Sequence, residues 1–378
     1  MSRWIAECLI LSALAAAMPA AVPFAVTAAE PSAELPKGWL LWHSYSDYSA
    51  LDSQLYLRDP DGRTENISGD FIHPMNGSFG TSPHQITFMA IDKETDEWDI
   101  YIRENGSITN LTKNSGFRNE DPKFSPDGRT VVFKRGRWDN EKNDFVYDLA
   151  LLEPETGDIS MLTADSDEEA MPCFDSDGSG IYYADYSGGM SSIRYYDTER
   201  HDTCIIYGNN SVSAYYPVVS GQRLYFTKWY SADDRCDQIV YFNGTDAVPL
   251  PFDSADYDCS DACPVDEDRM IFSSTMSGGY DLYYYDGSSV FALSELNSDK
   301  NELGADFYSY EEYLENSFVR GDVNDDGEFG VADLVIFQKW LLADKDTKLK
   351  KWRAADLCRN NRLDVYDLVL MRKELLMK

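Results

Sequence analysis

The sequence predicts a mainly β protein in which a ring of six small sheets precedes a short all-α module. Residues 36–310 consist of short strand-like segments separated by Gly, Asp, Asn and Ser, and these segments recur about every 45 residues. Residues 320–378 instead carry two copies of one polar loop, each followed by a helical apolar pattern. Residues 1–29 form a third region, which is short and mostly apolar. The chain therefore divides into a leader, a β domain, a short connection at 311–319 and a C-terminal module.

The leader has the three parts of a secretory signal peptide. Arg3 gives it a basic tip, residues 8–22 are mostly apolar, and small residues follow up to Ala29. Pro19 and Pro23 interrupt the apolar run, which favours cleavage near Ala29 over a retained membrane anchor. Outside the leader, no stretch approaches the roughly 20 apolar residues that a membrane-spanning helix needs. The mature protein is therefore expected to be exported, without membrane insertion.

The composition is strongly acidic, and this narrows the range of partners. The chain has 66 acidic and 33 basic residues, which gives a formal net charge of −33. Nucleic acid and anionic membranes would repel such a protein, so neither is expected as a partner. Six cysteines remain after the leader, and none has a zinc-type spacing. Export permits disulfides, and Cys236, Cys259 and Cys263 are close in sequence, but free buried thiols fit equally well.

Each copy of the β repeat contains four strand-like segments. The clearest copy runs through 121–128, 130–133, 148–152 and 159–163. The third and fourth segments recur six times, whereas the first has five copies marked by a following proline, which begin at His73, Asp121, Met171, Tyr216 and Cys263. This pattern resembles the TolB-like (PD40, WD40-like) β-propeller repeat, in which the four segments are strands a to d of one blade. The resemblance implies a six-bladed propeller over residues 36–310.

The first blade opens at Gly38 and has no proline-marked first segment of its own. Residues 305–310 follow the last copy of the repeat, at the place where a seventh first segment would fall. We expect this segment to supply the inner strand of the first blade and so close the ring, which removes two exposed sheet edges. The alternative is that 305–310 belongs to the connection.

A propeller of this kind would bind a ligand at the mouth of its central channel, either a plant cell-wall polysaccharide or a protein partner. The d–a loops would place His73, Asp121, Met171, Tyr216 and Cys263 there, and the b–c loops would add aromatic residues. Aromatic faces and polar groups together suit a sugar ring, which stacks on the former and hydrogen-bonds to the latter. Many of these aromatics would instead pack between blades. The candidate ligand-binding residues are His73, Asp121, Tyr216, Trp98, Trp138 and Trp229.

An enzymatic role for the ring is the competing hypothesis, and the catalytic residues stay unknown. Some propellers of this repeat type belong to uronate lyases that hold a metal through histidines, but this chain has four histidines, of which His43 and His73 could meet. A glycoside hydrolase needs two carboxylates at a fixed separation, which so acidic a sequence neither supports nor excludes. There is no Gly-x-Ser-x-Gly pentapeptide, phosphate loop or Rossmann glycine pattern.

The two C-terminal loops carry the ligand spacing of a calcium loop. Side-chain oxygens at positions 1, 3, 5 and 12, with a bend at position 6, allow alternate residues to surround a hard dication. In loop 1, Gly327 makes the bend and Glu328 offers its backbone carbonyl. In loop 2, Asn361 stands at the bend and the soft donor Cys358 at position 3, so this site is expected to be weaker. The predicted ligands are Asp322, Asn324, Asp326, Glu328 and Asp333 for site 1, and Asp356, Cys358, Asn360, Arg362, Asp364 and Asp367 for site 2.

No helical pattern precedes either loop, and position 12 is Asp rather than Glu. This duplicated loop–helix resembles the type I-like dockerin module of cellulosomal proteins over the whole of 320–378; two acidic surface turns are the alternative reading. The resemblance implies two calcium ions, a cohesin domain of a scaffoldin as partner, and a secreted, extracellular protein associated with the cellulosome at the cell surface. By the same resemblance, the cohesin-binding residues are Val331, Ala332, Lys339, Val365, Tyr366 and Lys373.

Overall fold

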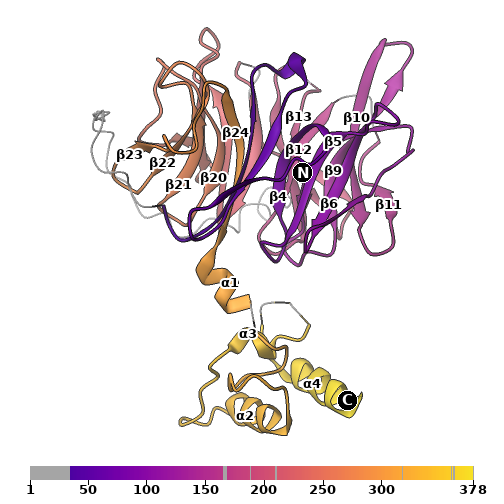
Figure 1. The fold of residues 1–378 in the computed structure, drawn as a ribbon, viewed down its shortest axis with the longest axis vertical. Helices are drawn as coiled ribbons and strands as arrows, with labels where there is room; N and C mark the ends of the chain where they lie inside the picture. The colour runs from indigo at the N-terminus through magenta and orange to yellow at the C-terminus, as the bar shows by residue number, and fades with distance from the viewer. Residues whose placement is uncertain are drawn as a thin grey trace, which may run out of the picture. The chain divides into compact units, whose positions relative to one another are not determined.

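The computed structural model describes residues 35–164, 168–187, 189–208, 211–316, 318–358, 360 and 362–377, so the predicted leader lies outside it. The chain divides between Tyr308 and Ser309 into two compact units. The first unit is built from antiparallel sheets and the second from short helices (Figure 1). None of the helices in these ranges has the length and apolar character needed to cross a membrane.

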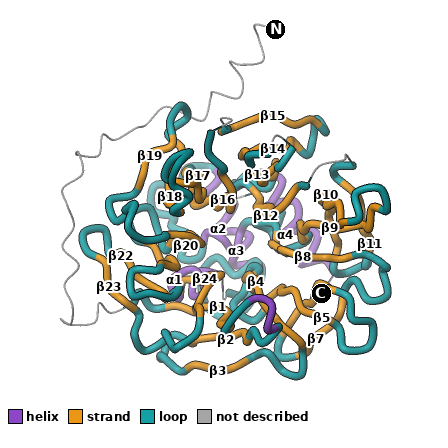
Figure 2. Tube along the Cα trace, turned by 90° about the horizontal axis from the view of Figure 1, so that it is seen from above, coloured by secondary structure: helices purple, strands orange, loops and turns teal. Residues whose placement is uncertain are grey.

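Six four-stranded sheets make up the first unit, and they stand around a common axis (Figure 2). This confirms the predicted six-bladed propeller. In five blades the four strands follow one another in the chain, whereas blade 1 has the order β24-β1-β2-β3. The ring is therefore closed by a strand from the far end of the unit, as the sequence predicts. The apolar side chains of neighbouring blades pack together in buried clusters, one of which joins Met89, Ile100 and Phe133.

The strand bounds follow the four-segment repeat. Blade 1 contains β24 (Asn301–Ser309), β1 (Gly38–Tyr45), β2 (Gln54–Arg58) and β3 (Thr64–Asn66), with a 3-10 helix at Tyr48–Ala50. Blades 2 and 3 contain β4 (Ile72–Phe79), β5 (Gln85–Ile91), β6 (Trp98–Glu104), β7 (Ser107–Asn110), β8 (Arg118–Phe124), β9 (Val131–Asp139), β10 (Asp144–Glu153) and β11 (Asp158–Met161). Blades 4 to 6 contain β12 (Glu169–Phe174), β13 (Gly180–Asp185), β14 (Ser192–Asp197), β15 (Asp202–Tyr207), β16 (Ala214–Ser220), β17 (Arg223–Trp229), β18 (Asp237–Phe242), β19 (Ala247–Pro249), β20 (Cys259–Pro264), β21 (Met270–Ser274), β22 (Asp281–Tyr285) and β23 (Val290–Ala292).

Apart from Asn76, which is a second such residue in β4, every inner strand contains one residue in the left-handed region of backbone conformation. The φ angles of these residues lie between 54° and 62°, and in the inner strands of blades 2 to 6 the register with the next strand shifts at this point. A bulge of this kind turns one side chain away from the regular alternation of a strand. The six residues are His73, Asp121, Met171, Tyr216, Asp261 and Gly304.

The position of the bulge shows that the predicted alignment of the last blade is wrong by two residues. The proline-marked pattern places Cys263 beside the other four residues, but the left-handed residue of β20 is Asp261. Cys263 instead packs in the apolar cluster between blades 6 and 1, together with Ile271 and Leu282. The structural repeat is a feature of the backbone, and proline follows it in only some of the blades.

A second recurring device ties the outer strand of a blade to the strand beside it. In five blades, a side-chain oxygen after the outer strand accepts a hydrogen bond from a backbone N–H group of the third strand, at 2.7 to 3.0 Å. Because each oxygen satisfies an N–H that the ladder leaves open, the short outer strand is held in register. The acceptor and donor pairs are Ser68 and Leu55, Thr112 and Ile100, Thr163 and Leu149, Asp253 and Ile239, and Asn297 and Leu282.

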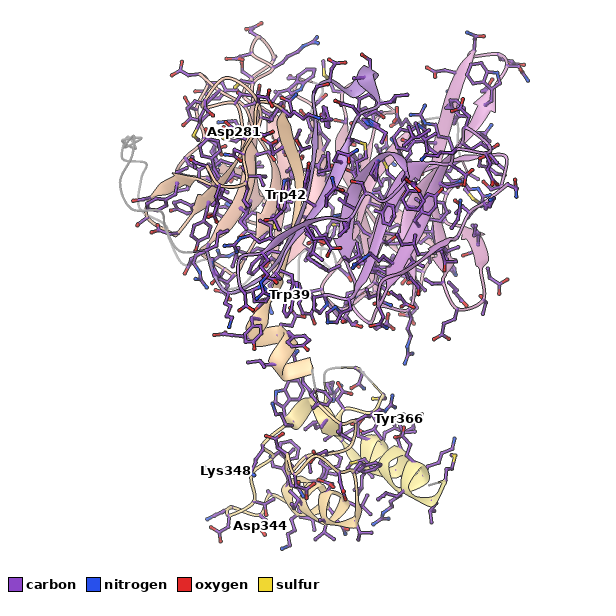
Figure 3. All side chains as sticks on the ribbon, in the orientation of Figure 1. Trp39, Trp42, Asp281, Asp344, Lys348 and Tyr366 are labelled. Atoms are coloured by element: carbon purple, nitrogen blue, oxygen red, sulfur yellow. The ribbon has the colours of Figure 1, made fainter. Side chains whose placement is uncertain are left out.

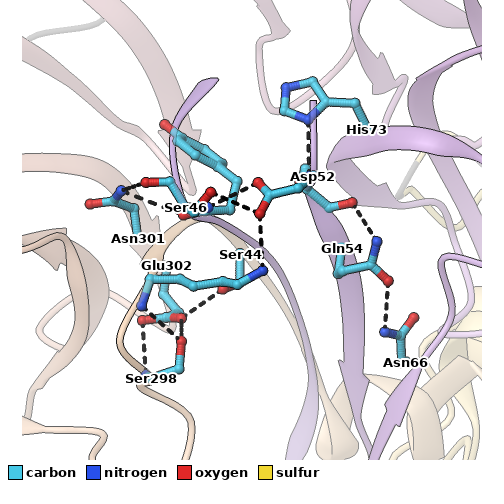
Figure 4. Close-up of polar contacts among 12 residues, drawn as sticks. Ser44, Ser46, Asp52, Gln54, Asn66, His73, Ser298, Asn301 and Glu302 are labelled. Atoms are coloured by element: carbon cyan, nitrogen blue, oxygen red, sulfur yellow. Dashed lines mark hydrogen bonds and ion pairs between the residues drawn. The ribbon is translucent and has the colours of Figure 1, made fainter. Parts of the chain in front are cut away.

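Strand β24 is fastened to blade 1 by a buried polar network (Figure 4). Glu302 is 1% exposed, and its carboxylate accepts hydrogen bonds from Ser44 Oγ at 2.7 Å and Ser298 Oγ at 2.5 Å. Asn301 Nδ2 donates to the backbone carbonyl of Ser46 at 3.2 Å. Further along the strand, Asp306 Oδ2 accepts from the backbone N–H of Phe79 in blade 2 at 2.8 Å. The last strand therefore bonds to the first two blades through its side chains as well as its backbone.

The loop and the long helix of the second unit each occur twice, and equivalent residues of the two copies are 34 positions apart. Its helices are α1 (Tyr310–Asn316), α2 (Val331–Leu341), α3 (Trp352–Ala355) and α4 (Val365–Met377), and α1 occupies most of the predicted connection. Its core pairs Val323 with Leu357 and Phe337 with Met371, all buried and all in one cluster. All six cysteines of the described chain, at positions 173, 204, 236, 259, 263 and 358, are free thiols.

Candidate functional site

Loop 1 of the second unit is folded around two buried carboxylates. Asp322 and Asp333 are 2% and 1% exposed. Asp322 accepts hydrogen bonds from the backbone N–H groups of Asp326 and Gly327 at 3.2 and 2.8 Å, and Asp333 accepts from Val323 and Gly330 at 3.0 and 2.9 Å. Gly327 has a φ of 90°, as the predicted bend requires. The two buried carboxylates and the side chains of Asn324 and Asp326 are hard oxygen donors at the spacing of a calcium loop, so the donor set of loop 1 fits a calcium ion.

Loop 2 repeats the backbone of loop 1. Asp367 is fully buried and accepts from the N–H groups of Cys358 and Asp364 at 3.2 and 3.0 Å, as Asp333 does in loop 1. Asp356 accepts from the N–H of Asn360 at 3.1 Å. The predicted bend residue, Asn361, lies outside the described residues. Metal-binding atoms of Asp356, Cys358 and Asp367 lie within 4.8 Å of one another. Loop 2 therefore also gathers ligands, although one of them is sulfur.

The helices that follow the loops expose two matching apolar stripes. Val331 and Val335 in α2 are 69% and 45% exposed, and Leu342 just beyond α2 is 76% exposed. Their counterparts in α4 are Val365, Val369 and Leu376, at 66%, 53% and 88%. The side chains of Ala332, Lys339 and Lys373 are also exposed. Tyr366, labelled in Figure 3, is 60% exposed. All six residues predicted for cohesin binding are thus accessible, and Val335, Leu342, Val369 and Leu376 extend them.

The central channel of the propeller holds a small cavity of about 40 Å³. The bulges of five blades bring their residues to its wall, and Lys123 and Asn76 join them there. Asp121 Oδ1 accepts a hydrogen bond from Asn76 Nδ2 at 2.7 Å, and Asp261 Oδ2 accepts from the backbone N–H of Gly304 at 2.8 Å. Burial raises the pKa of the Asp261 carboxyl and raises that of the Tyr216 hydroxyl well above its ordinary value. The cavity therefore offers carboxyl, hydroxyl, amide and ammonium groups together.

Aromatic and acidic residues also gather where blade 5 meets blade 6. Trp229 and Asp237 face each other across the β17–β18 hairpin. The Tyr215 hydroxyl donates a hydrogen bond to the Asp237 carboxylate, and the backbone N–H of Asp237 donates to Asp258 Oδ1 at 2.9 Å. Burial, together with the neighbouring Asp258 and Asp261 charges, raises the pKa of the Asp237 carboxyl to about 7, although the Tyr215 hydrogen bond lowers it. Asp237 can therefore hold a proton near neutral pH.

The predicted ligand-binding residues are distributed between the surface and the core. Trp138 is 50% exposed and Trp229 partly exposed, each at a b–c hairpin, and Asp121 and Tyr216 line the channel cavity. Trp98 and His73 are only 7% and 1% exposed. Their rings pack edge-on with centroids 5.6 Å apart. The first four are at least partly exposed, whereas Trp98 and His73 are enclosed in the fold.

The two histidines that the sequence brings together are buried among tyrosines. His43 stacks on Tyr45 with ring centroids 5.8 Å apart, and His73 lies edge-on to Tyr48 at 5.2 Å. Each Nδ1 accepts a backbone N–H, from Asn76 at 3.4 Å and from Ser53 at 3.0 Å. Burial lowers the pKa of His43 to about 3, so its ring is neutral at physiological pH. Both rings are therefore engaged in packing and backbone hydrogen bonds.

Sequence reasoning misses several residues that the fold brings to these sites. Asp261 and Gly304 escape because the bulge, not a residue type, defines their position. Lys123 and Asn76 reach the channel from the strand residues just after a bulge, a direction that strict alternation would not give. The outer residues of the two apolar stripes could have been found, because the 34-residue spacing repeats them in the sequence.

The second unit matches a known family model, and the first resembles known structures. Residues 320–376 match the type I dockerin domain. No curated protein sequence matches the chain. Among solved structures, TolB from Acinetobacter baumannii is 14% identical with a TM-score of 0.56, over 71% of this chain and 66% of TolB. Hydrazine synthase from Kuenenia stuttgartiensis is 14% identical with a TM-score of 0.61, over 74% of this chain and 47% of that one. The chain thus spans less than two thirds of either structure, and these likenesses concern the fold of the propeller.

Proposed function

We propose that this protein is secreted and carries its propeller to a scaffoldin. The type I dockerin domain at 320–376 supports this, because such a domain belongs to a cohesin-binding component of a cellulosome. Calcium in loop 1 fixes the entry to α2, because Asp333 is both a ligand and a residue of the first helical turn. The propeller is then the cargo, and it adds recognition of a plant cell-wall polysaccharide to the assembly.

The observation that carries the docking role is the pair of exposed apolar stripes. Val331, Val335 and Leu342 in one copy match Val365, Val369 and Leu376 in the other, and all are at least 45% exposed. So many exposed branched side chains in one small unit are typical of a surface that a partner covers. Both stripes are built on helices anchored to the loops. Metal binding therefore controls the shape of the surface.

The docking role is tested by binding to a panel of cohesin domains. Val331→Asp combined with Val365→Asp should abolish capture, since each change puts a charge into an apolar interface. The matched control is Ile205→Asp, because Ile205 is 62% exposed on an outer propeller strand. The far-ultraviolet circular dichroism of each variant in calcium checks that the helices still form. Capture that persists in the double variant would refute the assignment of this surface.

The proposal for the propeller rests on the exposed aromatics at two of its b–c hairpins and on the polar residues of its channel. Trp138 and Trp229 can each stack on a sugar ring, and Asp121 and Tyr216 offer hydrogen bonds to its hydroxyls. Affinity electrophoresis of the full chain in gels that contain cell-wall polysaccharides tests this. Trp138→Ala and Trp229→Ala should lose the retardation, whereas Trp352→Ala, which removes a 40% exposed tryptophan from the second unit, should not. Retardation that no propeller variant changes would count against the proposal.

A hydrolytic propeller is the second candidate, and Asp237 is the observation that favours it. A carboxyl with a pKa of about 7 next to the carboxylate of Asp258 has the protonation that a general acid of a glycoside hydrolase needs. Release of reducing sugar, measured on the same polysaccharides, tests this candidate. Activity lost in Asp237→Asn but kept in Asp253→Asn, whose acid tethers an outer strand, would establish the enzyme over the binding module.

A further inference from the structure

The two loops of the second unit have one backbone and different donor atoms. The N–H groups of Asn324 and Cys358 both donate at 3.2 Å, to Asp333 and to Asp367 respectively. Both residues therefore stand at position 3, where the side chain is a metal ligand. Loop 1 has a hard amide oxygen there and loop 2 has sulfur. The surrounding hydrogen bonds keep this single position matched between the loops.

Loop 2 also offers less negative charge at position 5. Asn360 has a neutral amide oxygen where loop 1 has the carboxylate of Asp326, while position 7 supplies a backbone carbonyl in both loops. Asp364 offers an acid at position 9, but its Oδ1 accepts the N–H of Tyr366 at 2.7 Å and so begins helix α4. Calcium takes six to eight oxygens and has little affinity for sulfur. With sulfur at position 3 and a neutral amide at position 5, loop 2 therefore fits calcium less well than loop 1 does.

Three of the remaining donors suit a smaller and softer ion. Cys358 Sγ lies 3.6 Å from Asp356 Oδ1, and both lie within 4.8 Å of the buried carboxylate of Asp367. With bonds of ~2.3 Å to sulfur and ~2.1 Å to oxygen, two ligands of a tetrahedral zinc ion are about 3.6 Å apart. The spacing already present in loop 2 thus matches a tetrahedral edge.

We propose that loop 2 is a site for a thiophilic dication of the zinc and cadmium class, held by Asp356, Cys358 and Asp367 with a water as fourth ligand. As the metal–sulfur bond forms, the thiol proton passes to solvent. The second unit is then a mixed-metal module, with calcium ordering α2 and the softer ion ordering α4. The inference depends on the proposed function only for the calcium in loop 1.

The test compares the full chain with two variants that exchange position 3 between the loops. Each metal-stripped protein is loaded with calcium and titrated with cadmium, and the ultraviolet absorption of the cadmium–thiolate bond is followed. Bound metals are counted by mass spectrometry after gel filtration. Cys358→Asn gives loop 2 the donor of loop 1, and Asn324→Cys gives loop 1 the donor of loop 2. Because both variants keep the five propeller cysteines, these contribute equally to each titration.

The native chain should hold one soft ion in the presence of excess calcium. Cys358→Asn should lose that ion, with affinity reduced roughly tenfold or more, and should lose the thiolate band. Asn324→Cys should gain a second band and lose calcium. Equal cadmium binding and equal absorption in the native chain and Cys358→Asn would overturn the proposal. Cohesin capture in calcium alone is measured separately, so a failure of the proposed docking is distinguished from a failure of the soft site.

Discussion

The propeller and the C-terminal module are both built from repeats, but the structural feature that repeats is different in each. In the propeller the repeated feature is a backbone bulge with φ of 54° to 62°, and its six residues are of five types. In the C-terminal module the repeated features include side chains, among them Asp322 and Asp356 in the loops and the exposed Val331 and Val365 in the helices. The ring therefore surrounds one channel with different chemistry on each side, whereas the module presents one surface twice.

The largest predicted effect is the loss of the duplicated surface when metal is removed. Asp322→Ala with Asp356→Ala, or an excess of chelator, should unfold the C-terminal module, because each buried partner carboxylate then loses its cation at a cost of roughly 3–5 kcal/mol. The propeller should be unaffected, since the two units are compact separately. Calorimetry should show the disappearance of one transition, together with loss of cohesin capture. Unchanged capture in chelator would contradict the metal dependence.

The ring should lose stability next most severely when its closing strand is removed. A chain that ends at Lys300 lacks the hydrogen bonds of Glu302, Gly304, Asp306 and Tyr308 to the neighbouring strands and loops. At roughly 1 kcal/mol each, these four bonds contribute about 4 kcal/mol to the free energy of unfolding. A chain that ends at Tyr310 keeps β24 and is the control. Equal melting temperatures for the two would assign 301–309 no role in closure.

The bulge can be tested at the position where it is tightest. Gly304 has a φ of 62°, and a Cβ there would stand 2.5 Å from the His43 ring. Gly304→Ala should therefore combine left-handed strain of about 1–2 kcal/mol with overpacking of about 1–3 kcal/mol. Gly157 has a φ of 77° and open space around it, so Gly157→Ala should show the strain alone. Chemical denaturation measures the loss of unfolding free energy in both variants. Equal losses would mean that the residues around Gly304 shift to accommodate the added methyl group.

How much the sequence predicts differs between the two repeats for the same reason. Side-chain repetition can be read from the sequence, so the two loops and the helices after them follow from spacing, and Val331 and Val365 are accessible as the family resemblance implies. The blades and the closing strand also follow, because strand periodicity and turn residues are local. Backbone repetition cannot be read from the sequence in this way. The proline-marked pattern indicates Cys263, which packs in an apolar cluster, whereas the bulge lies two residues earlier at Asp261. The burial of His73 and Trp98 depends on neighbouring blades, which no local pattern encodes.

The smallest predicted effect is a pH dependence of the stability of the propeller, which comes from the buried His43. The pKa of His43 falls from 6.5 to about 3 in the folded ring, because burial and the nearby His73 and Lys123 charges disfavour the imidazolium. As the pH falls, the unfolded chain therefore takes up a proton on His43 at a higher pH than the folded chain does. The stabilising contribution is complete above pH 6.5 and is lost progressively as the pH falls toward 3, by up to about 2 kcal/mol at pH 5.

His43→Phe should flatten this part of the stability profile, because phenylalanine can stack on Tyr45 as the imidazole does and has no proton to bind. His84→Phe is the matched control, since His84 is exposed on the same ring. Thermal unfolding of the propeller transition between pH 7 and pH 4.5 measures the slope in both. If the slope is as steep in His43→Phe as in the native chain, the acid sensitivity of the ring comes from its carboxylates, and the channel histidine is only a packing residue.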